Sequence, residues 1–340
     1  MKRPCMHVRA TLAAKLAATL IAPLAATAAC ITLWAGCVQA QDYPHKPVRL
    51  VVPYAAGGLP DTIARTLAQR LADDLGQQFV IDNRAGGGGL PACEFVARSA
   101  ADGYTLLVGD VSQMSINPFI YKVLPYDPVR DFSPISLLGL SPLFLVLHPS
   151  VPANTFQELV AYARAHPGEL NYGSSGSGSI HQLAVEALKH ALGLDLVHIP
   201  FKGTGQSVPA LLGGQVSMLY SALPAIAPHV KTGKVKLIAA STPARSPQAP
   251  DVPTIAELGI PDYDYPAEIG LLAPIGTPPA IIARLNAAVV RALKHPEARA
   301  RFAALGIDPV GGSPEAYGER IRTGMDKYAR IVRIAGVRAD

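Results

Sequence analysis

The stretch Val48-Arg49-Leu50-Val51-Val52-Pro53-Tyr54-Ala55-Ala56-Gly57-Gly58 shows how the fold of this chain starts. Its first five residues form an apolar run that is typical of a buried strand. The turn after them is rich in small residues, and Asp61 follows as a plausible helix N-cap. The next apolar residues recur every four positions, as on one face of a helix: Ile63, Leu67, Leu71 and Leu75. Strand, loop and helix in this order predict a parallel sheet covered by helices.

The same order of strand, loop and helix recurs along the chain. Further strands are expected at 79–81, 104–108, 170–172, 196–201, 216–220 and 236–240. Further helices are expected at 92–100, at 155–165, from the end of the 174–179 loop to about 192, and around 208–212. Others are expected after Pro224 and at 278–294, 297–305 and 314–334. Two extended segments flanked by proline, 143–149 and the stretch after Tyr263, are candidate crossings between two domains. Two crossings would make the first domain discontinuous, with the C-terminal helices returning to it.

Residues 1–40 have the pattern of a targeting segment. A basic start precedes an apolar, alanine-rich run over 16–34, and Val38-Gln39-Ala40 places small residues before a cleavage site. We therefore expect a mature chain that begins near Gln41 and is exported. A retained membrane anchor is one alternative, because the apolar run is long enough to span a bilayer. A lipoprotein is another, because the residues before Cys37 resemble a lipobox.

Composition and charge exclude some classes of protein. The chain has 340 residues, of which 49% are apolar and 16% charged, with a formal net charge of +5. These values indicate a folded protein that is long enough for two domains. Residues 1–40 hold four of the basic residues and no acidic one, which leaves 26 Lys and Arg against 25 Asp and Glu. The rest of the chain therefore lacks the excess of positive charge that a nucleic-acid-binding protein needs.

Cysteine adds little to the functional interpretation. Of the four cysteines, Cys5, Cys30, Cys37 and Cys93, only the last lies beyond the predicted cleavage site. A single cysteine forms no internal disulfide and no structural zinc site. We expect Cys93 to be a small buried residue of a helix rather than a nucleophile.

Four loops rich in glycine or serine each stand directly before an expected helix. They lie at 57–58, 86–89, 174–179 and 203–205. Ligands of open α/β sheets sit at the carboxyl ends of the strands, where helix N-termini offer free N–H groups and partial positive charge. Together these loops predict a site for an anion that needs no lysine or arginine. The alternative is that each loop is only a tight turn.

Motifs of common enzymes are absent from the sequence. GxSxG, a complete GxGxxG, a Walker loop and HExxH do not occur. A secreted serine hydrolase that uses the Ser174–Ser179 loop and His181 remains an alternative, although no third group to orient the histidine is visible. His181 either donates to a bound anion, or only caps its helix or faces solvent. His198 is expected to be structural, and Lys202 either reaches the cleft or lies in solvent.

From about residue 43 to the C-terminus, the chain resembles the Bug-type receptors of tripartite tricarboxylate transporters. Several motifs carry this resemblance together: the 43–65 segment, Asn83-Arg84, Asp102-Gly103-Tyr104-Thr105-Leu106-Leu107, Leu124-Pro125-Tyr126-Asp127-Pro128, Leu170-Asn171-Tyr172-Gly173-Ser174-Ser175-Gly176, Val197-His198-Ile199-Pro200-Phe201-Lys202-Gly203, Leu211-Leu212-Gly213-Gly214-Gln215-Val216, Arg245-Ser246, Asp251-Val252-Pro253-Thr254 and Gly270-Leu271-Leu272-Ala273-Pro274. Many relatives have a small residue or glycine after the second glycine-rich loop, where this chain has Leu90-Pro91-Ala92-Cys93.

The resemblance implies an α/β fold of the two-lobed, type II periplasmic binding protein kind, a Venus flytrap whose lobes are mostly parallel sheets flanked by helices. Lobe 1 would comprise 41–142 plus 265–340, and lobe 2 would comprise 143–264, after a cleaved signal peptide over 1–40. Such a receptor is a periplasmic monomer that binds a di-, tri- or aromatic carboxylic acid and delivers it to the transporter's membrane subunits. We expect no enzymatic activity, no metal, no other cofactor and no nucleic-acid partner. An orphan receptor used for sensing is the remaining alternative.

The resemblance also implies which residues contact the ligand. In the first lobe they are Tyr54, Ala55, Ala56, Gly57, Gly58, Asp61, Gly88 and Asp110. In the second lobe they are Ser174, Ser175, Ser177, Gly178, Ser179, His181, Gly203, Thr204 and Ser221. Ser221 stands where amino-acid-binding relatives have an aspartate. The ligand is therefore expected to be a carboxylate without an amino group.

Overall fold

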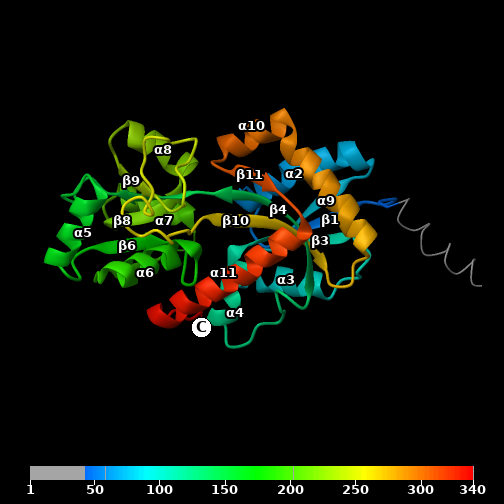
Figure 1. Cartoon of the computed structure of the whole chain (residues 1–340), viewed down its shortest axis with the longest axis horizontal. Helices are drawn as coiled ribbons and strands as arrows, with labels where there is room; N and C mark the ends of the chain where they lie inside the picture. Colours follow the sequence, from blue (N-terminus) through cyan, green and yellow to red (C-terminus); the bar gives the residue numbers. More distant parts are fainter. Residues whose placement is uncertain (1–42, 58, 202, 340) are drawn as a thin grey trace, which may run out of the picture. The chain divides into compact units, whose positions relative to one another are not determined.

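The alternation of strands and helices builds two separate sheets (Figure 1). The computed structural model describes residues 43–57, 59–201 and 203–339. The predicted signal peptide with its cleavage site, Gly58 and Lys202 lie outside these residues. Residues from Lys46 onward form one compact unit. The expected α/β class is confirmed.

The first sheet has six strands in the order β11-β4-β10-β3-β1-β2. They are β1 (Val48–Val52), β2 (Phe79–Asn83), β3 (Thr105–Asp110), β4 (Phe132–Ser141), β10 (Ala267–Pro274) and β11 (Asp308–Gly311). β1 pairs in parallel with β2 and β3. β10 runs antiparallel between β3 and β4, and β11 is antiparallel to β4.

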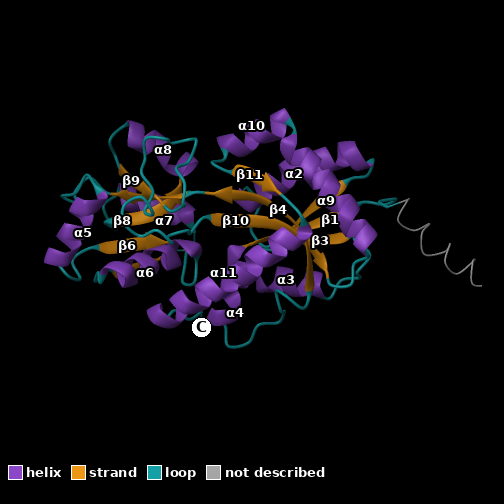
Figure 2. Ribbon diagram, viewed as in Figure 1, coloured by secondary structure: helices purple, strands orange, loops and turns teal. Residues whose placement is uncertain are grey.

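Helices and single turns connect these strands and cover the sheet (Figure 2). They are α2 (Leu59–Leu75), the turn η1 (Gly87–Gly89), α3 (Leu90–Ala97), the π-helical turn η2 (Ser112–Ile116), α4 (Asn117–Ile120), α9 (Pro279–Lys294), α10 (Pro296–Ala304) and α11 (Pro314–Ala335). α3 starts directly after the glycine run, and Pro91 stands in its first turn. Proline is well tolerated there because the first N–H groups of a helix have no partner inside it.

The second sheet has five strands in the order β7-β6-β8-β5-β9. The strands are β5 (Leu143–Leu147), β6 (Asn171–Ser174), β7 (Val197–Pro200), β8 (Met218–Ala222) and β9 (Lys236–Ala240). The helices are α5 (Phe156–Ala165), α6 (Ile180–Leu192), α7 (Thr204–Leu212) and α8 (Leu223–Lys231). β6 pairs in parallel with β7 and β8, whereas β5 is antiparallel to both β8 and β9.

The structure corrects three details of the expected fold. Segment 143–149 is not a crossing, because its first five residues are β5, which is paired on both sides. The crossing is made at Pro142, the one residue between β4 and β5. β4, β10 and β11 were not expected as strands. Both sheets are mixed, although most strands of each still run in one direction because only β5, β10 and β11 are reversed.

The long helix α11 packs against elements of both sheets. It contacts β4 and η2 of the first sheet and α6, which covers the second. Its buried residues Tyr328, Ile331 and Val332 belong to the same hydrophobic core as Leu183 of α6. Burial of such side chains is the main favourable term in folding. The second half of α11 therefore contributes to the core around the second sheet.

Candidate functional site

A cleft of about 530 Å³ is lined by residues from both sheets. It contains most of the residues that the sequence predicted for the site: Tyr54, Gly57, Gly88, Asp110, Ser175, Ser177, Gly178, Ser179, His181, Gly203, Thr204 and Ser221. Four others do not line it: Ala55 and Ala56 are exposed, and Asp61 and Ser174 are buried. The structure thus brings together loops that are far apart in the sequence.

Among the described residues, four helices of nine or more residues begin at this cleft. The first residues of α6, α7 and α8 reach it from the second sheet, and those of α2 reach it from the first. Ser179 caps α6 through a hydrogen bond that its side chain accepts from Gln182 N–H. Helix N-termini carry partial positive charge and unpaired N–H groups. The cleft is therefore suited to an anion.

A buried network forms the wall of the cleft on the side of the first sheet. The Tyr54 hydroxyl donates to Asp110 Oδ2, and Ser112 N–H donates to Asp110 Oδ1 at 2.7 Å. Gln113 Nε2 donates to the Tyr54 hydroxyl at 2.9 Å, and Gln113 Oε1 accepts from Asp110 N–H at 3.0 Å. Burial raises the pKa of Asp110, and the bonds from Tyr54 and Ser112 oppose that rise. The network fixes the acid in place at the end of β3.

Asp61 supports the cleft from behind. It is only 1% exposed and accepts hydrogen bonds from Gly57 N–H, Arg65 Nε and Asn83 Nδ2 at 2.9–3.0 Å. Burial alone would raise its pKa, but the bonds from Arg65, Gly57 and Asn83 together lower it. Asp61 therefore holds the loop after β1 against the end of β2. The structure gives it a positioning role rather than a place in the cleft lining.

The wall on the side of the second sheet is the serine-rich loop at the start of α6. Ser175 Oγ lies 2.7 Å from His181 Nδ1. Burial lowers the pKa of His181 to about 4, so that this histidine is neutral at neutral pH. Ser174 is turned away from the cleft and lies 2.7 Å from His198 Nε2. His198 also stacks on Tyr172, in keeping with the structural role expected for it.

The two walls approach each other closely at two points. A Cβ on Gly178, in the loop before α6, would lie 2.3 Å from Ile120 Cδ1 of α4. A Cβ on Gly306, which follows α10, would lie 2.5 Å from Pro224 Cδ of α8. Real Cβ atoms do not approach other atoms so closely. A side chain at either position would force its neighbour to move, and both glycines have a positive φ, of +77° and +70°, which other residues rarely adopt.

Several cleft residues were missed by the sequence analysis. Ser112, Gln113, Asn117 and Tyr121 all follow β3 and line the cleft. One available signal was the rule that ligands sit at the carboxyl ends of strands, which applies to residues after Asp110. The π-helical geometry of η2 is a second signal, because such turns are frequent at functional sites, but it is visible only in the structure.

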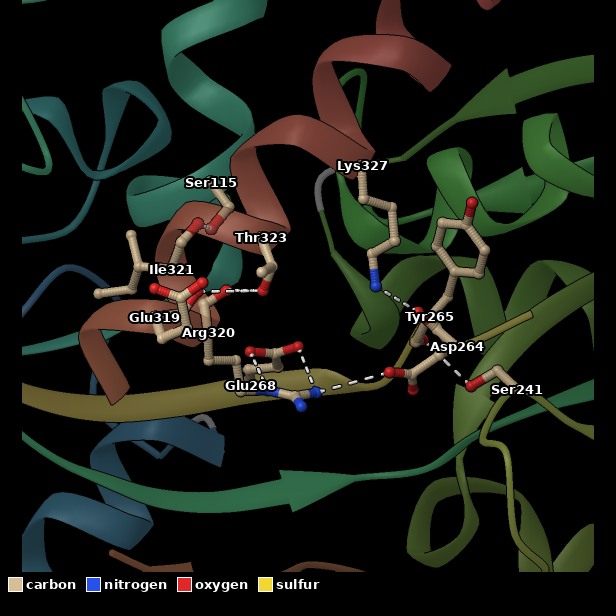
Figure 3. Close-up of polar contacts among 10 residues, drawn as sticks. All are labelled: Ser115, Ser241, Asp264, Tyr265, Glu268, Glu319, Arg320, Ile321, Thr323 and Lys327. Carbon is tan, nitrogen blue, oxygen red and sulfur yellow. Dashed lines mark hydrogen bonds and ion pairs between the residues drawn. The ribbon is translucent and has the colours of Figure 1, made fainter. Parts of the chain in front are cut away.

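A second cavity, of about 360 Å³, lies on the other side of β10. Ala267 and Ile269 line the cleft, whereas Glu268 between them lines this cavity, as expected for alternating strand residues. Arg320 of α11 binds both oxygens of Glu268, at 2.8 and 2.7 Å (Figure 3). It also lies 3.7 Å from Asp264 Oδ2. These charges connect α11 to the segment that returns to the first sheet.

One further expectation concerns Cys93, which lies outside the cleft lining. Cys93 is fully buried in α3, and burial raises the pKa of its thiol. It is therefore a structural residue, as expected. Within the described part of the chain, no helix has both the length and the apolar character needed to cross a membrane.

Comparison with known proteins identifies relatives over most of the chain. The family described as "Tripartite tricarboxylate transporter family receptor" matches residues 63–337. Protein BugT of Bordetella pertussis is 36% identical over 302 residues, which are 88% of this chain and 93% of that protein.

Solved structures show the same fold. An R. palustris protein solved with adipate is 35% identical, with a TM-score of 0.79 over 87% of this chain and 99% of that one. MatC from Rhodopseudomonas palustris, solved with bound malate, is also 35% identical, with a TM-score of 0.75 over 85% of this chain and 100% of that one. These matches confirm the family resemblance and the two-lobed fold expected from the sequence.

Proposed function

Because this chain belongs to the family of tripartite tricarboxylate transporter receptors, we propose that it captures a small carboxylate between its two sheets. It then delivers the acid to the membrane subunits of a transporter. The observation that carries this proposal is the convergence of four helix N-termini on one cleft. Relatives solved with adipate and malate support the same class of ligand.

The cleft works by enclosing the acid. Lobe 1 comprises 41–142 plus 265–340 and lobe 2 comprises 143–264, and each supplies one wall. N–H groups and hydroxyls that are already in place orient the carboxylate, with little reorganisation on binding. Closing the lobes excludes water and gives the transporter a shape to recognise. Besides the predicted residues of the lining, Gln113 and Tyr121 complete this site.

The protein acts in the periplasm as a monomer. The pattern of residues 1–40 supports export and cleavage near Ala40-Gln41. The mass of the protein recovered from the periplasm tests this directly. A mature mass that begins at Gln41 supports cleavage there, whereas a lipid-modified Cys37 or an uncleaved chain would contradict it. Light scattering of the same sample measures its oligomeric state.

A hydrolase is the competing function, and one observation favours it. Ser175 and His181 are within hydrogen-bond distance, as a nucleophile and its base would be. No carboxylate bonded to His181 is found among the described residues, however, and the family that matches residues 63–337 is one of transporter receptors. Turnover of ester substrates that is lost in Ser175→Ala would favour the hydrolase over the receptor.

Thermal unfolding of the purified protein against a panel of acids tests the receptor function. The panel holds mono-, di- and tricarboxylic, aromatic and amino acids. A ligand at about 1,000 times its Kd stabilises a protein by about 4 kcal/mol, which corresponds to roughly 8–16 °C for domains of this size. A shift with one or a few acids is the expected result. No shift with any acid, in protein first unfolded and refolded to release bound ligand, would refute the proposal.

A further inference from the structure

Asp110 is an acidic residue in the lining of a cleft that we propose binds carboxylates. Its two oxygens accept hydrogen bonds from the Tyr54 hydroxyl and from Ser112 N–H, which hold it at the end of β3. The other titratable groups of the described lining are Tyr54, Tyr121 and His181. His181 carries no charge at neutral pH, because burial lowers its pKa to about 4. The described lining therefore contains no cation for Asp110.

The position of Asp110 decides which end of a ligand it meets. Of the described helices of nine or more residues that begin at the cleft, α6, α7 and α8 belong to the second sheet and α2 to the first, where the short η2 and α4 also begin. On the first sheet, the Gly57 N–H is already bonded to Asp61. The carboxylate of a ligand is therefore best placed against the second wall. Asp110 stands on the opposite wall, where a second carboxylate would be repelled.

We propose that Asp110 is a specificity-determining residue, which selects acids that carry a hydrogen-bond donor, an ammonium or a hydroxyl, at the end that faces the first sheet. The inference rests on the proposed function, because it needs a carboxylate at the other wall. It also revises the expectation drawn from Ser221: the acid missing at that position is supplied by Asp110, from the other lobe. Hydrogen bonds to a charged partner are the strong ones.

The test compares matched acids that differ in one group. Succinate, malate and aspartate have the same chain with no donor, a hydroxyl and an ammonium, and glutarate, 2-hydroxyglutarate and glutamate repeat the series one carbon longer. Calorimetric titration of each acid is done with the wild type and with Asp110→Asn, which keeps the size of the side chain and removes its charge. Glu94→Gln is the matched control, because that half-buried acid lies on α3, outside the cleft lining, in an ion pair with the exposed Arg98.

In the wild type, a donor-bearing acid is expected to bind about tenfold or more tightly than the bare acid of the same length. Asp110→Asn should reduce that ratio several-fold, and Glu94→Gln should leave it unchanged. Comparing the affinity for malate with that for aspartate, and for 2-hydroxyglutarate with that for glutamate, shows whether the preferred donor is a hydroxyl or an ammonium. The inference is overturned if bare diacids bind at least as tightly as their donor-bearing partners, or if the preference survives in Asp110→Asn.

A second variant covers the case in which Asp110→Asn does not fold. Tyr54→Phe keeps Asp110 but removes the hydroxyl that holds its side chain in place. This variant should weaken the binding of donor-bearing ligands more than the binding of bare diacids. An equal effect on both would count against the inference. The wider acid panel separates this failure from that of the function. Binding of carboxylates without a donor preference refutes only the role of Asp110, whereas no binding of any acid refutes both.

Discussion

The ion pair between Arg320 and Glu268 gives the sharpest prediction about stability. The Glu268 side chain is only 12% exposed and the Arg320 side chain 31%, and two hydrogen bonds join them. Removing one partner of a buried pair costs about 3–5 kcal/mol, because the other charge is left without compensation. Arg320 is partly exposed, so that the lower end of this range applies. Arg320→Met should therefore destabilise the protein by about 3 kcal/mol, or roughly 6–12 °C.

The loss should depend on pH in a defined direction. Burial raises the pKa of Glu268, and Arg320 opposes this rise. Without the arginine, the pKa in the folded state rises further above its value in the unfolded chain. The penalty of the buried charge is then present in full above the folded pKa, and it disappears as the pH falls toward the unfolded value of about 4.3. Arg320→Met should thus recover stability on acidification relative to the wild type.

Urea unfolding followed by circular dichroism measures both effects. The double variant Arg320→Met with Glu268→Gln should be more stable than Arg320→Met alone at neutral pH, since the Glu268 charge that lost its partner is also removed. Arg322→Met is the control, because its pair with Glu319 is exposed on the same helix and should contribute less than about 1 kcal/mol. A loss below about 1 kcal/mol for Arg320→Met, or a loss that is independent of pH, would refute the reasoning.

Three further predictions concern the cleft and its supports. Gly178→Ala places a Cβ 2.3 Å from Ile120 Cδ1 at a φ of +77°, so it should hold the walls apart and weaken acid binding about tenfold or more by calorimetry. Unchanged affinity would contradict this. Asp61→Asn should cost about 2–3 kcal/mol in urea unfolding. Because the pKa of Asp61 is lowered in the fold, the difference from wild type should vanish as the pH falls below about 4, and a constant difference would contradict the assignment. His181 has a folded pKa of about 4, so wild-type stability should contain a component that is lost as the pH falls from about 6.5. His181→Gln should lack that component in pH-dependent thermal unfolding, and identical pH profiles would argue against it.

The sequence pattern predicted those elements whose formation depends mainly on residues that are close together in the chain. The apolar run of β1, its glycine turn and the regular spacing in α2 are visible without any knowledge of the partners. β4, β10 and β11 are not, because Pro134 and Gly139 interrupt β4, Gly270 interrupts β10 and Pro309 interrupts β11. They become strands only through pairing with neighbours that are distant in the sequence. The crossing was misplaced for the same reason, since β5 looks like an isolated extended segment until β8 and β9 lie beside it.

The site divides in a similar way. The loops were predictable because the carboxyl ends of parallel strands meet at one edge of a sheet. The role of each polar side chain in these loops was not predictable from the sequence. Asp61 lies in the first turn of α2 and Ser174 at the start of a predicted loop. Their oxygens bond to Gly57 N–H and to His198 and do not line the cleft. Gln113 carries no motif, and its importance follows only from the three loops that it joins.

The helix termini at the cleft also bear on how such a receptor changes over evolutionary time. The groups that would hold a carboxylate there are peptide N–H groups, and a point mutation replaces a side chain but leaves the peptide in place. Recognition of the acid is thus protected from mutation by the backbone. Side chains of the opposite wall, such as Asp110, have no such protection and can vary one at a time. Receptors with this cleft can therefore change their preferred acid by single mutations and still bind acids as a class.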